Sequence, residues 1–255
     1  MKRLKLTALL FAFTVISAFA DMPKINDIMN KIDDITQLKT DGTAKVKITQ
    51  QKVNQGLKVL ESIYYRRDRD DAFLIVMTAP EVEKGNGYLR VGDNFWMYRR
   101  NTRTFQHVNR DENIAGTDAK GEDFENKKMI ELYKPSVDKS GKEIISEEKL
   151  GKVDTYKFEI IARKDDVSYP KKTFWIAKDT FLPLKEMDYS LSGTLMNTSY
   201  FINYTQLQGK YLWTKAMFID EFEKGNKTVV EISDISIKKI DDSIFTKAYL
   251  ENLSK

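Results

Sequence analysis

The chain contains no cysteine and only one histidine among its 255 residues. Without cysteine it has no disulfide bond, no thiol nucleophile and no cysteine-ligated zinc site. We interpret the single histidine, His107, as a polar surface residue, and adjacent carboxylates such as Asp33 and Asp34 as solvated turn residues. No G-x-S-x-G motif, phosphate-binding glycine loop or calcium loop is present. We therefore expect neither an enzyme nor a protein that needs a metal or another cofactor.

The first twenty residues have the pattern of a secretory signal peptide. A basic start precedes an apolar run from Leu6 to Ser17, and Ala18-Phe19-Ala20 forms a small-x-small cleavage site. The run is shorter than the roughly twenty apolar residues of a membrane span. We therefore expect residues 1–20 to be removed and residues 21–255 to form a single domain in a bacterial periplasm.

The charge of the exported part is nearly balanced. The whole chain has 42 basic and 38 acidic residues, but three of the basic ones lie in the leader, which leaves a net charge near +1. This balance argues against nucleic acid as the main partner. Two basic clusters in predicted turns offer a docking site for an acidic partner or for anionic lipid headgroups, with a solvated rim as the alternative: Arg66, Arg67, Arg99, Arg100 and Arg103.

Most of the exported chain has the alternating pattern of β-strands. Only two helices are predicted, an amphipathic one whose apolar stripe runs from Ile25 to Ile35 and a second one from Glu122 to Tyr133. The remaining segments predict about ten antiparallel strands, which are joined mainly by hairpins at glycine-containing turns. The run Ala72 to Thr78 is continuously apolar, which favours a strand covered on both faces.

A single sheet of this size has more apolar surface than two helices cover. The strand from Phe95 to Arg99, for example, carries large apolar groups on both of its alternations. A filled sandwich is the simpler interpretation of the composition. The alternative is a sheet that curls into a partial barrel and leaves an apolar hollow.

Three stretches resemble the outer-membrane lipoprotein-sorting proteins of the LolA-like superfamily. They span residues 84–124, 174–222 and 241–250, and they share spaced aromatic residues, glycines and one proline, Pro183. This resemblance covers nearly all of the exported chain. It implies a mainly β (α+β) fold: a curved antiparallel half-barrel of ten to eleven strands, with helices as a lid over an apolar cavity.

The resemblance also implies a function. It suggests a periplasmic carrier that binds the acyl chains of lipoproteins or other lipids and moves them from an inner-membrane exporter to an outer-membrane acceptor. The alternative is a periplasmic lipid or lipoprotein sensor that regulates an envelope-stress signalling partner. We expect a monomer. We predict that the cavity is lined by side chains from the first helix and from three strands: Ile28, Met29, Ile32, Trp96, Tyr98, Tyr200, Ile202 and Tyr204.

Overall fold

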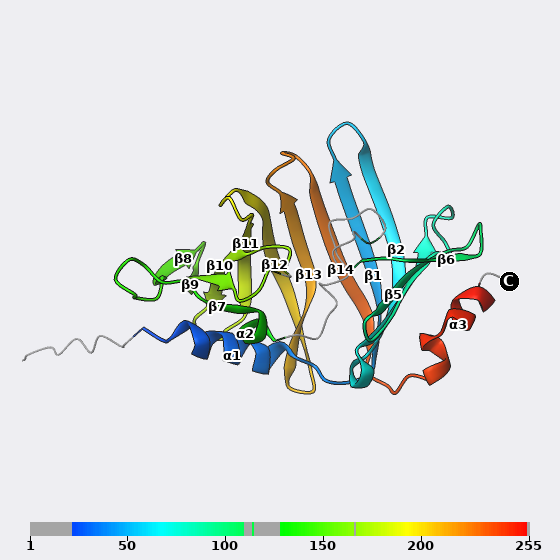
Figure 1. Cartoon of the computed structure of the whole chain (residues 1–255), viewed down its shortest axis with the longest axis horizontal. Helices are drawn as coiled ribbons and strands as arrows, with labels where there is room; N and C mark the ends of the chain where they lie inside the picture. Colours follow the sequence, from blue (N-terminus) through cyan, green and yellow to red (C-terminus); the bar gives the residue numbers. More distant parts are fainter. Residues whose placement is uncertain (1–21, 110–113, 115–127, 166, 254–255) are drawn as a thin grey trace, which may run out of the picture.

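The computed structural model describes residues 22–109, 114, 128–165 and 167–253 (Figure 1). The predicted leader and residues 122–127 of the predicted second helix lie outside these ranges. The strands are β1 (Gly42–Lys52), β2 (Gly56–Arg67), β3 (Ala72–Ala79), β4 (Gly87–Val91), β5 (Asn94–Arg99), β6 (Thr104–His107), β7 (Tyr133–Pro135), β8 (Ile145–Leu150), β9 (Val153–Ala162), β10 (Lys171–Ala177), β11 (Pro183–Tyr189), β12 (Leu195–Leu207), β13 (Lys210–Asp220) and β14 (Lys227–Ser236). The helices are α1 (Ile25–Thr36), η1 (Asp68–Asp70), α2 (Met129–Leu132), η4 (Asp242–Phe245) and α3 (Lys247–Asn252).

All fourteen strands belong to one antiparallel sheet, in the order β6-β5-β4-β3-β2-β1-β14-β13-β12-β11-β10-β9-β7, with β8 paired to β9. Figure 1 shows that this sheet is curved, with α1 and α2 near one end and α3 near the other. The prediction of a curved, unclosed antiparallel sheet is confirmed, but the strand number is higher than expected. The additional strands include β7 and β8, which are too short or too polar to show a clear alternation.

Helix α1 follows the predicted apolar stripe. Ile25, Ile28, Met29 and Ile32 are buried, and the helix begins after Pro23. Helix α2 begins at Met129, after an extended Lys128, and ends before Tyr133, which pairs with Ala162 as the first residue of β7. None of the helices in the described ranges combines the length and the apolar composition that a membrane crossing needs.

Strand β3 is covered on both faces, as its continuous apolar run predicts. Phe73, Ile75 and Met77 belong to one hydrophobic cluster, whereas Leu74 and Val76 belong to another. The second cluster includes the C-terminal residues from Ile240 to Leu250. This end of the molecule is therefore layered, with apolar packing on each side of the sheet.

The strand register shows which residues share the face that α1 covers. Directly paired residues lie on the same face, and one continuous row of pairs crosses the sheet: Phe158, Phe174, Glu186, Ser199, Phe218, Thr228 and Gln50. Ile48 lies two residues from Gln50 and pairs with Leu60, a member of the Phe73 cluster. The cluster under α1 and the Phe73 cluster therefore lie on one face, which we call the inner face.

Candidate functional site

The middle of the inner face carries a group of partly covered aromatic side chains among polar residues such as Ser199 and Thr228. Phe201 and Phe218 come from β12 and β13, and both are half-buried. The Trp213 ring lies near both, with centroids 6.3 Å from Phe201 and 6.4 Å from Phe218. Ala216 and Val230 pair beside these rings and are buried. This strip, which we call the aromatic strip, lies between the two hydrophobic clusters of the inner face.

Helix α1 covers the neighbouring part of the inner face. Its apolar side packs against Phe158 and Phe174. Among its polar contacts with the described residues, the Ile25 N–H donates to Glu143 Oε2 at 2.8 Å, the Met129 N–H donates to Asp33 Oδ1 at 3.2 Å, and Lys210 Nζ donates to the Asp34 carbonyl at 2.5 Å. Apolar packing and a small set of polar contacts therefore position the helix on the sheet.

Asp33 is the most unusual of these groups. Burial raises the pKa of the Asp33 carboxyl, although the N–H groups of Met129 and Ile130 act in the opposite direction. Its Oδ2 atom is buried and has no hydrogen-bond partner among the described residues. The carboxyl therefore ties α1 to α2 through one oxygen, at the cost of burying the other without a described partner.

Two polar hollows lie near the C-terminal end of α1. The first has a volume of about 440 Å³ and lies between α1 and the β12–β13 turn, lined by Asn30, Asp33, Asp34, Gln37, Leu38, Lys39, Lys128, Gln208 and Lys210. The second has a volume of about 740 Å³ and is lined by Lys39, Thr40, Asp41, Asp68, Arg69, Ile237 and Lys239. Both hollows are lined mainly by polar and charged side chains, so neither is the predicted apolar hollow.

A buried ionic cluster occupies the inner face beside α1. Lys172 Nζ lies 2.5 Å from Glu186 Oε1 and 3.0 Å from Asp188 Oδ1. The rings of Tyr133 and Tyr169 lie 5.7 Å and 5.6 Å from the same ammonium group. One lysine thus faces two carboxylates in a largely apolar setting.

Burial sets the protonation of this cluster. It raises the pKa of Glu186 to about 8; the attraction of Lys172 opposes part of this increase, and the negative charge of Asp188 adds to it. Burial alone lowers the pKa of Lys172, but the two carboxylates outweigh it and raise that pKa well above its usual value. The sequence patterns did not predict this cluster. Its only signal is the alternation of Glu186 and Asp188 on one strand, and the register is needed to place Lys172 opposite them.

The predicted cavity residues divide between the two faces. Ile28, Met29 and Ile32 are buried on the inner face. Tyr204 also faces this side, because its hydroxyl donates to the Pro183 carbonyl at 2.6 Å and its pKa is raised by burial and by Glu186. Ile202 lies at a register irregularity between the pairs of Phe201 and Asn203, and it is half exposed.

The other three predicted residues lie on the outer face. Tyr200 pairs with Lys185 and Met217, and the Lys185 ammonium lies 5.6 Å from its ring. Trp96 and Tyr98 pack in the cluster of the C-terminal segment, and Lys247 Nζ lies 4.3 Å from the Trp96 ring. Large apolar groups occur on both alternations of β5, so the sequence did not show which alternation faces inward.

The predicted docking arginines also have different surroundings. Arg99, Arg100 and Arg103 are exposed at the β5–β6 turn. Arg66 bonds Asp68 at 2.5 Å. Arg67 is only 6% exposed, so it is not available as a surface docking group.

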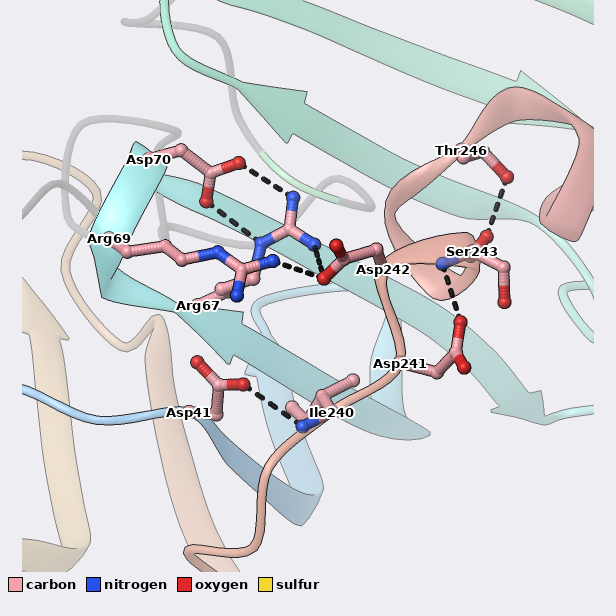
Figure 2. A network of polar contacts seen from close by, with 9 residues as sticks. All are labelled: Asp41, Arg67, Arg69, Asp70, Ile240, Asp241, Asp242, Ser243 and Thr246. Carbon is pink, nitrogen blue, oxygen red and sulfur yellow. Dashed lines mark hydrogen bonds and ion pairs between the residues drawn. The ribbon is translucent and has the colours of Figure 1, made fainter.

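Figure 2 shows how Arg67 holds the C-terminal segment. Its guanidinium donates to both Asp70 oxygens, at 2.8 and 2.6 Å, and to Asp242 Oδ1 at 3.0 Å. Arg69 also contacts Asp242. The Ile240 N–H donates to Asp41 Oδ2 at 2.9 Å, and the Arg67 guanidinium lies 4.2 Å from the Phe245 ring. The network fixes η4 and α3 on the outer face.

The described residues include no group of three or more histidine, aspartate or glutamate side chains that could hold a metal ion. His107 is exposed at the end of β6, and its ring lies edge-on to Trp96 at 6.2 Å. What the arrangement offers chemically is the partly covered aromatic strip beside helix α1.

A family model described as "Uncharacterized protein" matches residues 69–252, which is well over half of the chain. The chain belongs to this family. None of the curated proteins matches its sequence.

Solved structures identify the fold. A LolA superfamily protein from Nitrosomonas europaea is similar with a TM-score of 0.71 and 22% identity, over 88% of this chain and 98% of that one. A domain from Vibrio parahaemolyticus, described as an outer membrane lipoprotein-sorting protein, is similar with a TM-score of 0.75 and 18% identity, over 88% of this chain and 97% of that one. A DUF1329 family protein from Desulfovibrio piger is similar with a TM-score of 0.76 and 19% identity, over 88% of this chain and 96% of that one. The predicted LolA-like fold is confirmed.

Proposed function

We propose that this LolA-like protein is a periplasmic carrier that binds the acyl chains of lipoproteins or other lipids on its inner face. The observation that carries the proposal is the aromatic strip of Phe201, Trp213 and Phe218, which is apolar, half-buried and adjacent to α1. An apolar surface of this kind beside a movable element suits a flexible hydrocarbon ligand. The descriptions of the Nitrosomonas and Vibrio proteins support the same function.

Simple energetics explain how such a face holds a lipid without covalent chemistry. An acyl chain gains about 0.8 kcal/mol for each CH₂ group that leaves water. Aromatic side chains offer broad contact surfaces that do not require one chain length. A carrier must also release its cargo, so α1 has to open at a modest cost in free energy. The few polar contacts of α1 and the buried, unpaired Asp33 oxygen are consistent with such an opening.

The proposal includes a route for the cargo. The signal-peptide pattern supports export from the cytoplasm. In the proposed route the protein works between two membranes, where an inner-membrane exporter would deliver the acylated cargo and an outer-membrane acceptor would receive it. The protein then needs no reactive side chain, because binding and release are its only steps. Conversion of a substrate by the purified protein would contradict this part of the proposal.

Two neighbouring residues on β13 allow a direct test. Phe218 faces inward, whereas Met217 pairs with Val229 and Tyr200 on the outer face. Phe218→Glu places a charge on the aromatic strip and should weaken binding of a fluorescent fatty-acyl probe at least tenfold, since a buried charge without a partner is costly. Met217→Glu adds the same charge one residue away and should leave probe binding unchanged.

The cargo itself is tested by mass spectrometry. Protein purified from membranes under mild conditions should carry acyl lipid that appears in an organic extract, and Phe218→Glu should carry less. Thermal unfolding of both variants checks that the fold is retained. Lipid-free wild-type protein that also ignores the acyl probe would overturn the proposal, as would equal probe binding by the two folded variants.

A further inference from the structure

The most exposed large apolar side chains of the described residues are concentrated at turns. Leu191 is 92% exposed, Val82 82%, Phe222 71% and Leu57 67%. Leu191, Val82 and Phe222 lie in the β11–β12, β3–β4 and β13–β14 connections, and Leu57 is the second residue of β2, beside the β1–β2 connection. Single exposed apolar residues are ordinary on protein surfaces, but here the four largest exposures share one kind of position.

These four turns lie on the same side of the sheet, at the ends of its strands. Neighbouring strands are antiparallel, so alternate connections come to the same side, and the β5–β6 turn joins them there. Figure 1 shows the β1–β2, β13–β14 and β11–β12 connections at the upper edge. We call this row of strand ends the tip edge. It comprises the turns and the strand residues beside them at 52–58, 80–86, 99–103, 190–194 and 221–227.

Specific contacts join the turns of the tip edge. The Val53 N–H donates to Asn226 Oδ1 at 2.9 Å, and a Cβ at Gly225 would lie only 2.7 Å from Val53 Cγ2. The β3–β4 and β5–β6 turns are also joined, because the Arg100 N–H donates to Asn86 Oδ1 at 3.0 Å. These contacts therefore join the β1–β2 turn to the β13–β14 turn and the β3–β4 turn to the β5–β6 turn.

The charge of the tip edge is positive. Its five turns contain four acidic residues, Glu81, Glu83, Glu221 and Glu223, against eight basic ones: Lys52, Lys58, Lys84, Arg99, Arg100, Arg103, Lys224 and Lys227. All four acids are engaged locally: Glu83 accepts from Asn86, Glu223 accepts from Asn226, Glu221 accepts from Thr198, and Glu81 pairs with Lys84 and Arg100. Within the described part of the chain, five of the eight basic residues form no ion pair with these acids: Lys52, Arg99, Arg103, Lys224 and Lys227. The exposed arginines that sequence analysis singled out lie on this same edge.

We propose that the tip edge docks onto an anionic lipid bilayer. Its apolar tips would enter the headgroup region while the surrounding lysines and arginines contact lipid phosphates. The positive charge favours this occupant, and so does the spacing of the tips on separate turns, which matches an interface of mobile lipids better than one continuous protein surface. This docking does not depend on what the inner face binds.

The position of the tip edge suits a carrier that works at membranes. Lys210, which holds α1, begins β13, whereas Phe222 follows the other end of that strand. Eleven residues of strand at about 3.3 Å each separate the two ends by roughly 35 Å. Docking through the tips would therefore leave the α1 end of the sheet away from the lipid surface.

Sedimentation with vesicles tests the proposal. The purified chain should bind vesicles of phosphatidylcholine with about one phosphatidylglycerol in three lipids, bind pure phosphatidylcholine weakly, and lose binding as salt is raised. Leu57→Ser/Phe222→Ser should reduce the affinity about tenfold. The matched control is Val137→Ser/Val153→Ser, which removes two exposed apolar side chains that lie outside the tip edge and should have no effect.

A spectroscopic measurement locates the contact. Because the chain has no cysteine, Phe222→Cys and Val137→Cys can each carry one environment-sensitive dye. Vesicles with phosphatidylglycerol should shift the emission of the dye at position 222 to the blue and leave position 137 unchanged. The proposal is overturned if the wild-type chain ignores these vesicles, if both double variants lose equal affinity, or if only a membrane protein extract, and not pure lipid, shifts the dye at position 222.

Discussion

The two faces of the sheet are covered by helices in different ways. On the outer face, η4 and α3 place Phe245 and Leu250 against β3 and β4, and the buried Arg67 ties them to the strands. On the inner face, α1 places four apolar side chains against β9 and β10, and its polar ties come from Glu143, Asp33 and Lys210. One cover completes a filled layer, and the other lies beside a partly open one. Both covers bury apolar side chains, but α1 also borders the partly open part of the inner face.

The covers also differ in their response to pH. The hydrogen bond from Arg67 lowers the pKa of Asp70 at the outer cover, whereas burial raises the pKa of Glu186 beside the inner cover. A carboxyl whose pKa is lower in the folded protein than in the unfolded chain stabilises the fold at pH values above the unfolded pKa. This stability is lost as pH falls through the folded pKa. A raised carboxyl pKa contributes stability at low pH that is lost as pH rises. Acid should therefore weaken the outer tie, and alkali the region under α1.

The largest expected effect comes from truncating each cover. Leu250 and Ile28 are both fully buried, and Leu250→Ala should lower the free energy of unfolding by about 3 kcal/mol in a urea titration. If α1 opens as the proposed function requires, Ile28→Ala should lower the free energy of unfolding less than Leu250→Ala does. It should also accelerate hydrogen exchange of the α1 amides, because α1 would then detach before the rest of the fold opens. Equal losses without faster α1 exchange would show that the two covers are equally fixed.

The second prediction concerns Glu186. Its pKa is about 8 in the folded protein against an ordinary value near 4.5, so wild-type stability should fall as pH rises through that interval, by at most about 1.4 kcal/mol per pH unit. Glu186→Gln cannot ionise, so it should flatten this dependence and be more stable than wild type at pH 8. Urea titrations across the interval measure the slope. An unchanged slope in the variant would remove Glu186 as its cause.

The third prediction compares two arginines that contact the same carboxylate, Asp242. The Arg67 side chain is 7% exposed and the Arg69 side chain 49%. Arg67→Met should therefore cost about 1–3 kcal/mol of unfolding free energy, whereas Arg69→Met should cost about 0–1 kcal/mol. Differential scanning calorimetry of both variants measures the contrast. Similar melting temperatures would show that the outer cover is held by its apolar contacts alone.

Sequence patterns predicted the parts of this comparison that depend on local periodicity. The stripe of Ile25, Ile28, Met29 and Ile32 on α1 follows from spacing alone, and the continuous run of β3 correctly indicated cover on both faces. These features were readable because each depends on neighbours within one element.

The features that depend on pairing between distant strands were not readable. Trp96, Tyr98 and Tyr200 were assigned to the cavity, yet register places them on the outer face. Arg67 looked like a surface group, because its partner Asp242 is 175 residues away. The ionic cluster required Lys172 to lie opposite Asp188, which only the β10–β11 register determines. Long-range contacts carry the site, and single-sequence patterns do not encode them.

The smallest expected effect tests whether α1 is held by weak ties. Lys210 contacts both the carbonyl and the carboxylate of Asp34 in the last turn of α1, and these groups are well exposed to solvent. Lys210→Ala should therefore change the free energy of unfolding by about 0–1 kcal/mol, while hydrogen exchange in the last turn of α1 becomes faster because its anchor to β13 is lost. The matched control is Lys215→Ala, which breaks a similarly exposed pair with Glu231 on the outer face of the same strand and should leave α1 exchange unchanged. If both variants leave α1 exchange at the wild-type rate, the apolar side chains alone decide how often the inner face opens.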